Sequence, residues 1–104
     1  MPETLPIETI KKNLKNLNGW TLSNDQKSIQ KSFKFKNFED TFAVMTKIAT
    51  IAEQQNHHPD WSNSYNKLHI TLTSHDSGGI TKRDITMAQQ INQFEAQSKT
   101  QHPA

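Results

Sequence analysis

Apolar residues recur at helical spacing near the start of the chain. Four of them follow one another every three or four positions, the spacing of a single helix face: Ile7, Ile10, Leu14 and Leu17. Pro6 suits the first turn of a helix, and Asn18-Gly19 suits a C-terminal stop. The pattern therefore predicts a first helix from about Pro6 to Leu17.

Two later segments alternate between apolar and polar residues, as strands with one buried face do. The apolar side of the first segment holds Ile29, Phe33 and Phe35, and Ser23-Asn24-Asp25 before it supplies the turn of a hairpin. The apolar side of the second segment holds Leu68, Ile70 and Leu72. Both segments are expected to form strands that leave one face of their sheet to solvent.

The period is helical again from Asn37 onward, with two apolar stripes. The first stripe consists of Phe38, Phe42, Met45, Ala49 and Ala52, and the second of Val44, Ile48 and Ile51. Together they cover about half of the helix surface, more than the roughly 100° that a core-facing helix needs. We expect the first stripe to face the sheet and the second to form a contact between subunits. A helix buried within one monomer is the alternative.

A last helix follows the turn sequence DSGG. Thr81 is predicted to be its N-cap with Asp84 at the third position, between Ile80 and Ile85 as a hydrophobic staple. The helix is expected over residues 82–96, with 97–104 as a frayed tail. The predicted order is α-β-β-α-β-β-α, an α+β fold with a four-stranded antiparallel sheet and three helices on one face.

Composition limits the size of the core. The chain has 104 residues, of which 32% are hydrophobic, which predicts one domain over residues 1–104. A chain of this length buries only about 60–65% of its unfolded surface. We therefore expect additional stability from a homodimer or homotetramer. The net charge of +2 is spread along the chain without a basic cluster, so we expect no nucleic-acid partner.

Several classes of protein are excluded or disfavoured. The chain has no cysteine, which rules out a disulfide framework, a cysteine-based zinc finger and a thiol nucleophile. The N-terminus lacks the charged and apolar regions of a signal peptide, and no apolar run approaches the roughly 20 residues that cross a bilayer. We expect a cytoplasmic protein that does not bind a membrane.

Candidate chemistry gathers at residues 53–61, which read EQQNHHPDW. His57 and His58 follow the second predicted helix, and His75 ends the last predicted strand. Pro59 restricts the backbone of His58 to extended conformations, which turns its ring away from that of His57. Loops on a rigid sheet are where functional residues concentrate. We therefore expect the three histidines to form a site, although each could also be a surface residue.

Other side chains near these loops have more than one interpretation. Glu53 lies one helical turn before His57 and either orients an imidazole or is solvated. Asp84 is either a helix cap or a site residue. Trp61 and Tyr65 are either wall and core residues or ligand contacts. The two remaining histidines are expected to face solvent, one on the polar side of a strand and one in the tail: His69 and His102.

Three histidines without a cysteine could also form a zinc site with an open fourth position. Adjacent His57 and His58 are awkward joint ligands, because successive side chains diverge. We therefore expect no metal.

The spacing of these residues resembles that of a known family. Glu53, His57-His58-Pro59, Tyr65, His75 and Asp84 are separated by three, five, nine and eight residues, as in the signature of pterin-4a-carbinolamine dehydratases. The surrounding HHPDWSNSYNKLHITLTSHDSGGITKRD is similar to that family throughout. The element order and the length also match, so the resemblance spans nearly the whole chain.

The resemblance implies a metal-independent hydro-lyase that needs no cofactor, because the pterin is its substrate. Such enzymes convert 4a-hydroxytetrahydropterin, including the tetrahydrobiopterin derivative, to quinonoid dihydropterin and water in pterin recycling. By the family's pattern, His57, His58 and His75 are catalytic. The substrate contacts would be His57, His58 and Pro59 together with Ser74, His75 and Asp76. Supporting roles are expected for Glu53, Trp61 and Asp84.

We assign His57 and His75 to proton transfer and His58 mainly to substrate binding. The resemblance leaves other functions open. The chain could be a non-catalytic binding module, such as a transcriptional dimerisation cofactor, in which the histidines are relics. It could also act on another pterin, such as one in molybdopterin metabolism. Intact histidines favour the dehydratase over the binding module, whereas the residues do not separate the two enzymes.

Overall fold

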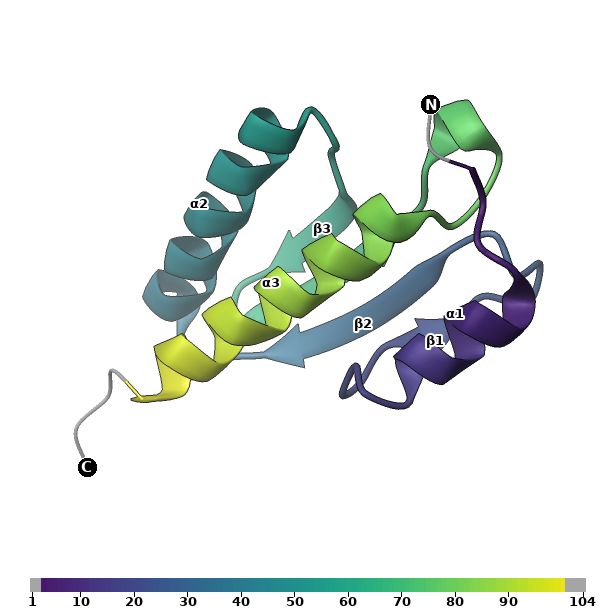
Figure 1. The fold of residues 1–104 in the computed structure, drawn as a ribbon. Coiled ribbons are helices and arrows are strands. Elements are labelled where there is room, and N and C mark those ends of the chain that lie inside the picture. Colours follow the sequence, from purple (N-terminus) through teal and green to yellow (C-terminus); the bar gives the residue numbers. More distant parts are fainter. Residues whose placement is uncertain (1–2, 101–104) are drawn as a thin grey trace.

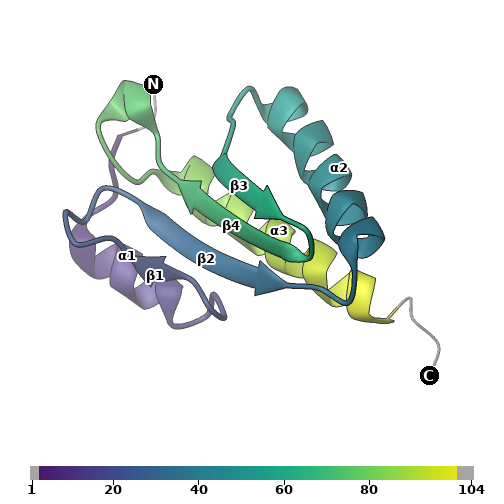
Figure 2. The same ribbon diagram turned by 180° about the vertical axis from the view of Figure 1, so that it is seen from behind.

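Three helices cover one face of a four-stranded antiparallel sheet, as the sequence predicts (Figure 1). The computed structural model describes residues 3–100, so the expectation for His102 lies outside them. The elements are α1 (Ile7–Leu14), β1 (Thr21–Leu22), β2 (Ile29–Lys34), α2 (Phe38–Gln55), β3 (Asp60–Ser64), β4 (Lys67–Leu72), a short 3₁₀ helix η1 (His75–Ser77) and α3 (Lys82–Thr100). The strand order is β1-β2-β4-β3, and Figure 2 shows the sheet from the side that the helices leave open.

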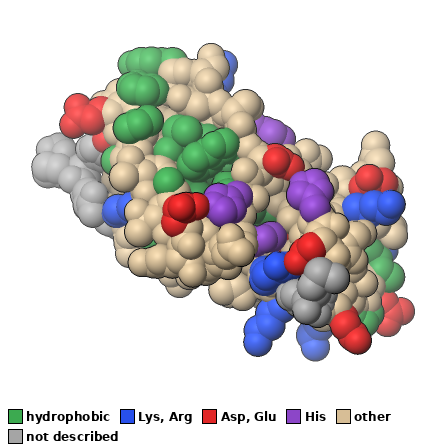
Figure 3. Space-filling view, turned by 90° about the horizontal axis from the view of Figure 1, so that it is seen from above, with side chains coloured by type: hydrophobic (Ala, Val, Ile, Leu, Met, Phe, Trp, Pro, Cys, Tyr) green, Lys and Arg blue, Asp and Glu red, His purple; other side chains and the backbone are tan. Residues whose placement is uncertain are grey.

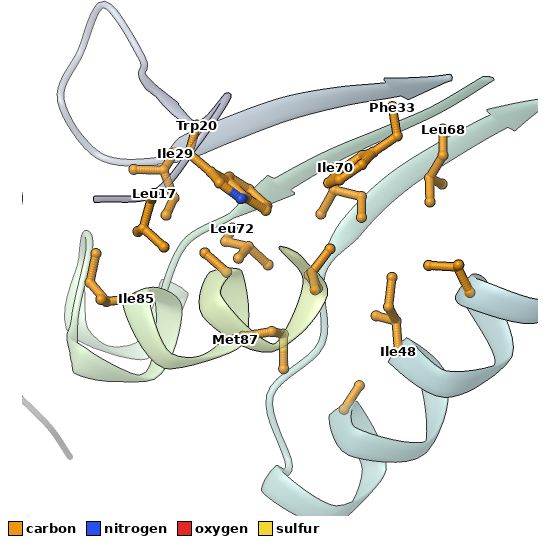
Figure 4. Packing of buried hydrophobic residues seen from close by; sticks show 14 of the residues in the cluster. Leu17, Trp20, Ile29, Phe33, Ile48, Leu68, Ile70, Leu72, Ile85 and Met87 are labelled. Carbon is orange, nitrogen blue, oxygen red and sulfur yellow. The ribbon is translucent and has the colours of Figure 1, made fainter. Parts of the chain in front are cut away.

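The core lies between the sheet and the helices (Figure 4). Phe33 on β2 is paired with Leu68 on β4, and Ile29 with Leu72, so the apolar sides of both strands coincide. α2 adds Ile48 to this layer, and α3 adds Met87. The predicted alternation of both strands is confirmed.

Lys31 is an exception to the alternation, because it lies on the core side of β2 opposite Ile70. Its ammonium donates hydrogen bonds to the Asn18 carbonyl at 2.8 Å and to the side chains of Asn92 at 2.9 Å and Glu95 at 3.1 Å. It also lies 4.6 Å from the centre of the Phe33 ring. These partners offset the loss of water around a charge under the helices and tie β2 to the C-terminal half of α3.

The prediction for the two stripes of α2 is wrong. Val44 and Ile48 are 2% and 0% exposed inside the monomer, so they are core residues and cannot form a contact between subunits. Phe38 and Phe42 of the first stripe are instead 43% and 54% exposed. Thr41 lies on the inward face beside Val44, where its hydroxyl is satisfied by the Asn37 carbonyl at 2.7 Å.

The other residues of the two predicted stripes lie partly on the buried face of α2 and partly on its exposed face. Ile51, which the sequence places with the subunit contact, is partly buried against the core. From the first stripe, Ala52 is buried and Met45 packs against the core, whereas Ala49 is exposed. The periodicity of α2 is therefore correct, and its inward face is misjudged by about one residue position.

Two helix ends also differ from the prediction. α1 ends at Leu14, and the chain continues through single turns in which the Leu17 N–H bonds the Leu14 carbonyl at 3.2 Å. Leu17 is still buried, because these turns keep it against the core. α3 continues to Thr100, past the predicted end at Ala96, and residues 101–104 lie outside the described part. Within the described residues, no helix is long and apolar enough to cross a membrane.

Candidate active site

The end of α2 separates the two adjacent histidines. Asn56 follows the helix in the left-handed conformation at φ 50°, and its N–H bonds the carbonyls of Ala52 and Glu53. Asparagine tolerates this conformation better than most residues. The reversal turns His57 inward, where its N–H bonds the Ala52 carbonyl at 3.1 Å, and leaves His58 exposed. The predicted divergence of the two rings is therefore present.

His57 is held by a buried carboxylate. Its Nε2 lies 2.6 Å from Oδ1 of Asp84, and the two side chains are 7% and 0% exposed. The second oxygen, Oδ2, accepts the Thr81 N–H at 2.9 Å and the Ser74 hydroxyl at 2.8 Å. The capping role of Asp84 is therefore present, and its other oxygen lies against an imidazole. The staple residues Ile80 and Ile85 are buried around this turn.

His58 is paired with Glu53 on the surface. Its Nε2 lies 2.5 Å from Oε2 of Glu53, and both side chains are largely exposed. The sequence indicates that Glu53 could orient an imidazole, and the structure places it against His58. Pro59, which follows, is half-buried.

His75 lies at the same end of the sheet as His57 and His58, in η1 after β4. Its Nε2 lies 3.7 Å from Oδ2 of Asp60, and both side chains are largely exposed. Asp60 is a residue that sequence reasoning did not single out. The strand register could have identified it. Asp60 is paired with Thr71 on the open face, which places its side chain near the end of β4, where His75 follows.

A hollow of about 360 Å³ opens beside His75 on the open side of the sheet. Its wall combines hydroxyl, carboxylate and ammonium groups with two glycines of the η1 loop: Asp25, Lys27, Ser28, Asp60, Thr71, Thr73, His75, Gly78 and Gly79. The Thr73 hydroxyl donates to the Lys27 carbonyl at 2.6 Å, which fixes the β1–β2 turn against this wall. Figure 3 shows histidine and acidic side chains gathered on the face at this end of the molecule.

Two of the predicted substrate-contacting residues, Ser74 and Asp76, use their side chains for hydrogen bonds to other residues of the protein. The Ser74 side chain is buried against Asp84, so it points away from the surface. The Asp76 carboxylate accepts a hydrogen bond from Arg83 at 2.5 Å. This hydrogen bond from the guanidinium lowers the pKa of Asp76 below its usual value, and the same bond raises the pKa of Arg83.

The aromatic candidates lie along the edge strand. Trp61 on β3 is paired with Ile70 and is 36% exposed. Tyr65 occupies the β3–β4 turn at φ 51° and is exposed, so it is neither a core residue nor part of the hollow beside His75. His69 lies on the open face, where its Nδ1 is 2.8 Å from the Ser32 hydroxyl.

Each of His57, His58 and His75 thus has its own carboxylate partner: Asp84, Glu53 and Asp60, respectively. Among the side chains that the structure describes, no group of three or more histidine and carboxylate residues is placed to hold a metal ion. The arrangement provides one nearly buried and two exposed imidazoles at neighbouring loops. Such an arrangement is suited to moving protons at a small molecule.

Comparisons with known proteins show the family of this chain. Residues 3–94 match the family described as Pterin 4 alpha carbinolamine dehydratase. A protein of Sinorhizobium fredii is 43% identical over 97% of this chain and 96% of its own length. A protein of Christiangramia forsetii is 46% identical over 88% of this chain and 92% of its own. Both relatives are provisionally named pterin-4-alpha-carbinolamine dehydratases.

Solved structures share the fold. A crystal structure from Brucella melitensis, described as a transcriptional coactivator/pterin dehydratase, has a TM-score of 0.86 and 37% identity over 88% of this chain and 98% of that chain. A pterin dehydratase-like RuBisCO assembly factor of the alpha-carboxysome has a TM-score of 0.64 at 19% identity, over 74% of this chain and 89% of its own, which shows the fold alone. The family match over most of the chain and the relatives above 40% identity place this chain in the pterin-4a-carbinolamine dehydratase family.

Proposed function

We propose that this chain removes water from 4a-hydroxytetrahydropterin to give quinonoid dihydropterin. Membership of the family supports the reaction. The observation that carries the proposal is the set of three histidines at two adjacent loops, each beside a carboxylate. A binding module would not need a buried imidazole whose orientation is fixed by a capping aspartate.

The reaction requires one proton to be delivered and another to be removed. The bond between C4a and the hydroxyl oxygen breaks, and a proton on that oxygen lets it leave as water. Loss of the proton on N5 supplies the electron pair that forms the new double bond between N5 and C4a. Imidazole is suited to both tasks, because it exchanges protons near neutral pH and acts as donor or acceptor.

His57 and His75 are the proposed pair for proton transfer. A carboxylate only accepts hydrogen bonds, so His57 donates from Nε2 to Asp84 and presents Nδ1 to the substrate. A carboxylate in this position fixes the orientation of the ring and stabilises the imidazolium that forms on protonation. His75, on the opposite loop and largely exposed, is free to reorient around the bound pterin.

His58 is the proposed substrate-binding histidine. Its ring is exposed and oriented by Glu53, so it can offer a hydrogen bond to the substrate at the entrance of the site. The segments His57–Pro59 and Ser74–Asp76 would contact the pterin, with the Ser74 contribution coming from its backbone because its hydroxyl is used inside. The pterin is the substrate, and no cofactor or metal enters the proposal.

We also infer that the protein acts in the cytoplasm, in pterin recycling, as a homo-oligomer. The surface proposed for subunit contact is the exposed side of α2, where Phe38 and Phe42 stack with ring centres 5.6 Å apart. Two exposed aromatic side chains on one helix face favour coverage by another copy. This surface replaces the one predicted from the sequence.

Stopped-flow absorbance tests the function directly. Purified protein should accelerate loss of 4a-hydroxytetrahydropterin, generated in the instrument by a hydroxylase, over the uncatalysed rate. The His57→Ala protein serves as the matched control for non-specific catalysis. A wild-type protein that does not exceed the uncatalysed rate would contradict the proposal and favour the binding module.

A further inference from the structure

A chain of hydrogen bonds behind His57 connects three buried polar residues. Ser74, Thr81 and Asp84 are 1%, 0% and 0% exposed. The Ser74 hydroxyl lies 2.8 Å from Thr81 Oγ1 and 2.8 Å from Asp84 Oδ2, and Asp84 Oδ1 lies 2.6 Å from His57 Nε2. The backbone N–H of Arg83 donates to Thr81 Oγ1 at 3.2 Å, at the far end.

Counting hydrogens fixes the direction of every bond in this chain. The Asp84 carboxylate only accepts, so the single hydroxyl hydrogen of Ser74 points to Oδ2. The bond between Ser74 and Thr81 must then use the Thr81 hydrogen, which leaves a lone pair of Thr81 for the Arg83 N–H. Each donor strengthens the next, and buried chains of this kind are rigid when every member is satisfied.

We propose that the Ser74 and Thr81 hydroxyls are positioning residues that hold Asp84, and through it the His57 ring, in its working orientation. The inference rests on the proposed function only in naming the reaction that His57 serves. The two hydroxyls touch no substrate. The Ser74 hydroxyl donates directly to Asp84 Oδ2, and the Thr81 hydroxyl acts one step behind it by donating to Ser74 Oγ. Together with the backbone N–H of Thr81, which also donates to Oδ2, they prevent rotation of the carboxylate and so fix which oxygen faces the imidazole.

Ser74 also fixes the loop that carries His75. Its backbone N–H bonds the Gly79 carbonyl at 2.9 Å, and its carbonyl accepts the N–H of Gly78 at 3.0 Å, which closes η1. The side chain of the same residue bonds Asp84, the partner of His57. Ser74 therefore fixes His57 and the backbone next to His75 with respect to each other, as two groups that act on one pterin require.

The test compares substitutions that remove one hydroxyl each. Ser74→Ala and Thr81→Val should lower kcat by up to about 10²-fold, the loss expected when a catalytic group is displaced by about 1 Å. KM should change much less, because neither hydroxyl contacts the substrate. Thr81→Ser keeps the hydroxyl and should retain a kcat near that of the wild type.

Proton NMR of the free protein supplies a readout that does not depend on activity. The His57 Nε2 proton, bonded to a buried carboxylate, should give a downfield signal that exchanges slowly with water. In Ser74→Ala and Thr81→Val this proton should exchange faster, because the ring and the carboxylate are less tightly held. Thr81→Ser should leave it unchanged.

Thr41→Val is the matched control for loss of a buried hydroxyl. Thr41 is also 0% exposed and bonded, but it lies at the start of α2 and its partner is the Asn37 carbonyl. It should cost stability without changing kcat or the His57 signal. Wild-type kcat and an unchanged His57 signal in Ser74→Ala would overturn the inference, as would an equal loss of kcat in Thr41→Val.

The two readouts also separate this inference from the proposed function. If the wild type fails to dehydrate the pterin but the His57 signal responds to Ser74→Ala, the positioning holds and the proposed reaction is wrong. If the wild type is active and the signal and kcat do not respond, the reaction holds and the positioning is wrong. Should Ser74→Ala fail to fold, Thr81→Val against Thr81→Ser makes the same comparison.

Discussion

His57 and Asp84 are joined by a hydrogen bond of 2.6 Å although they lie 27 positions apart in the chain. The bond connects the loop after α2 to the first turn of α3 and is almost withdrawn from water. Asp84 thereby caps α3 with one oxygen and places a carboxylate next to the His57 imidazole with the other. Because the contact depends on charge and on hydrogen-bond direction, a substitution of Asp84 that keeps its shape but removes its charge should still disturb His57.

Asp84→Asn should therefore be strongly impaired. The two donors to Oδ2, the Thr81 N–H and the Ser74 hydroxyl, would select the amide oxygen of the new side chain. Its NH₂ group would then face His57 Nε2, which must become an acceptor, so the proton moves to Nδ1. The nitrogen proposed to meet the substrate would be in the wrong protonation state, and kcat should fall by about 10²–10⁴-fold.

Nitrogen-15 NMR of the imidazole measures this directly, because it reports which ring nitrogen carries the proton. The wild type should show the Nε2–H form of neutral His57, and Asp84→Asn the Nδ1–H form. An Asp84→Asn protein with normal kcat and the wild-type tautomer would show that the carboxylate does not orient the ring.

Much of the fold follows from the sequence because strand alternation and helix periodicity are local properties. The order of elements, the faces of β2 and β4, and the cap formed by Thr81 and Asp84 were predictable for that reason. The inward face of α2 was not, because two adjacent stripes have the same period. The stripe that faces inward also contains the polar Thr41, whose hydroxyl bonds the Asn37 carbonyl, and hydrophobicity does not predict its burial.

For the candidate site, the sequence indicated the histidines but not the carboxylate that each of them contacts. Its histidines follow from their positions at the ends of elements and from the family's spacing. Their carboxylate partners depend on tertiary contacts: Glu53 meets His58, and Asp60 meets His75. The core-side position of Lys31 also needed tertiary information, because its partners Asn92 and Glu95 lie more than 60 residues away, on α3.

Chelation should leave activity intact. The proposed acid and base are imidazoles, so prolonged treatment with a strong chelator followed by gel filtration should not change kcat in the stopped-flow assay. Metal analysis of the same sample should show that it contains no bound metal. Activity that disappears on chelation and returns with zinc would revive the three-histidine metal site.

The surface pair Asp76–Arg83 predicts a measurable titration. Because the Arg83 guanidinium lowers the pKa of Asp76, carboxyl carbon NMR should place its midpoint below the ordinary value of about 3.9. The associated stability is present above the unfolded-state pKa and is lost as the pH falls through the lower folded-state pKa. Both groups are partly exposed, so this contribution is small.

Arg83→Gln should return the Asp76 midpoint to the ordinary range. Asp25 is an internal control, because its pKa is lowered first by the Ser23 hydroxyl and not by an arginine. Its midpoint should be the same in both proteins. An unchanged Asp76 midpoint in Arg83→Gln would mean that the ion pair is absent in solution.

Two substitutions on α2 should have different consequences. Ile48 is fully buried in the core, so Ile48→Asp places an unpaired charge there and should lower the free energy of unfolding by about 3–5 kcal/mol. Phe42 is more than half exposed, so Phe42→Glu should keep the monomer folded. If α2 forms the subunit contact, Phe42→Glu should also lower the mass measured by light scattering.

Denaturation and light scattering on both proteins distinguish the core from the contact surface. An Ile48→Asp protein with wild-type stability would contradict the burial of this helix face. A Phe42→Glu protein with the parent's mass would remove the exposed aromatic face from consideration as the contact.

The histidines themselves provide the most direct test of the proposed mechanism. His57→Ala and His75→Ala should each lower kcat by about 10²–10⁴-fold, the usual contribution of a positioned acid or base. His58→Ala should mainly raise KM, because a group that holds substrate equally in the ground state and the transition state contributes uniform binding. The effects should not add logarithmically, since the three residues serve one reaction as a unit.

His69→Ala is the control of the same residue type. It lies on the open face of β4, where its contact is with Ser32, and it does not border the hollow beside His75. Its kcat and KM should match the wild type. A His69 protein as damaged as the His57 protein would mean that the substrate binds next to Ser32 and His69 and not in the hollow beside His75. Full activity in His57→Ala would remove the buried imidazole from the reaction, and the carboxylate behind it would then be only a helix cap.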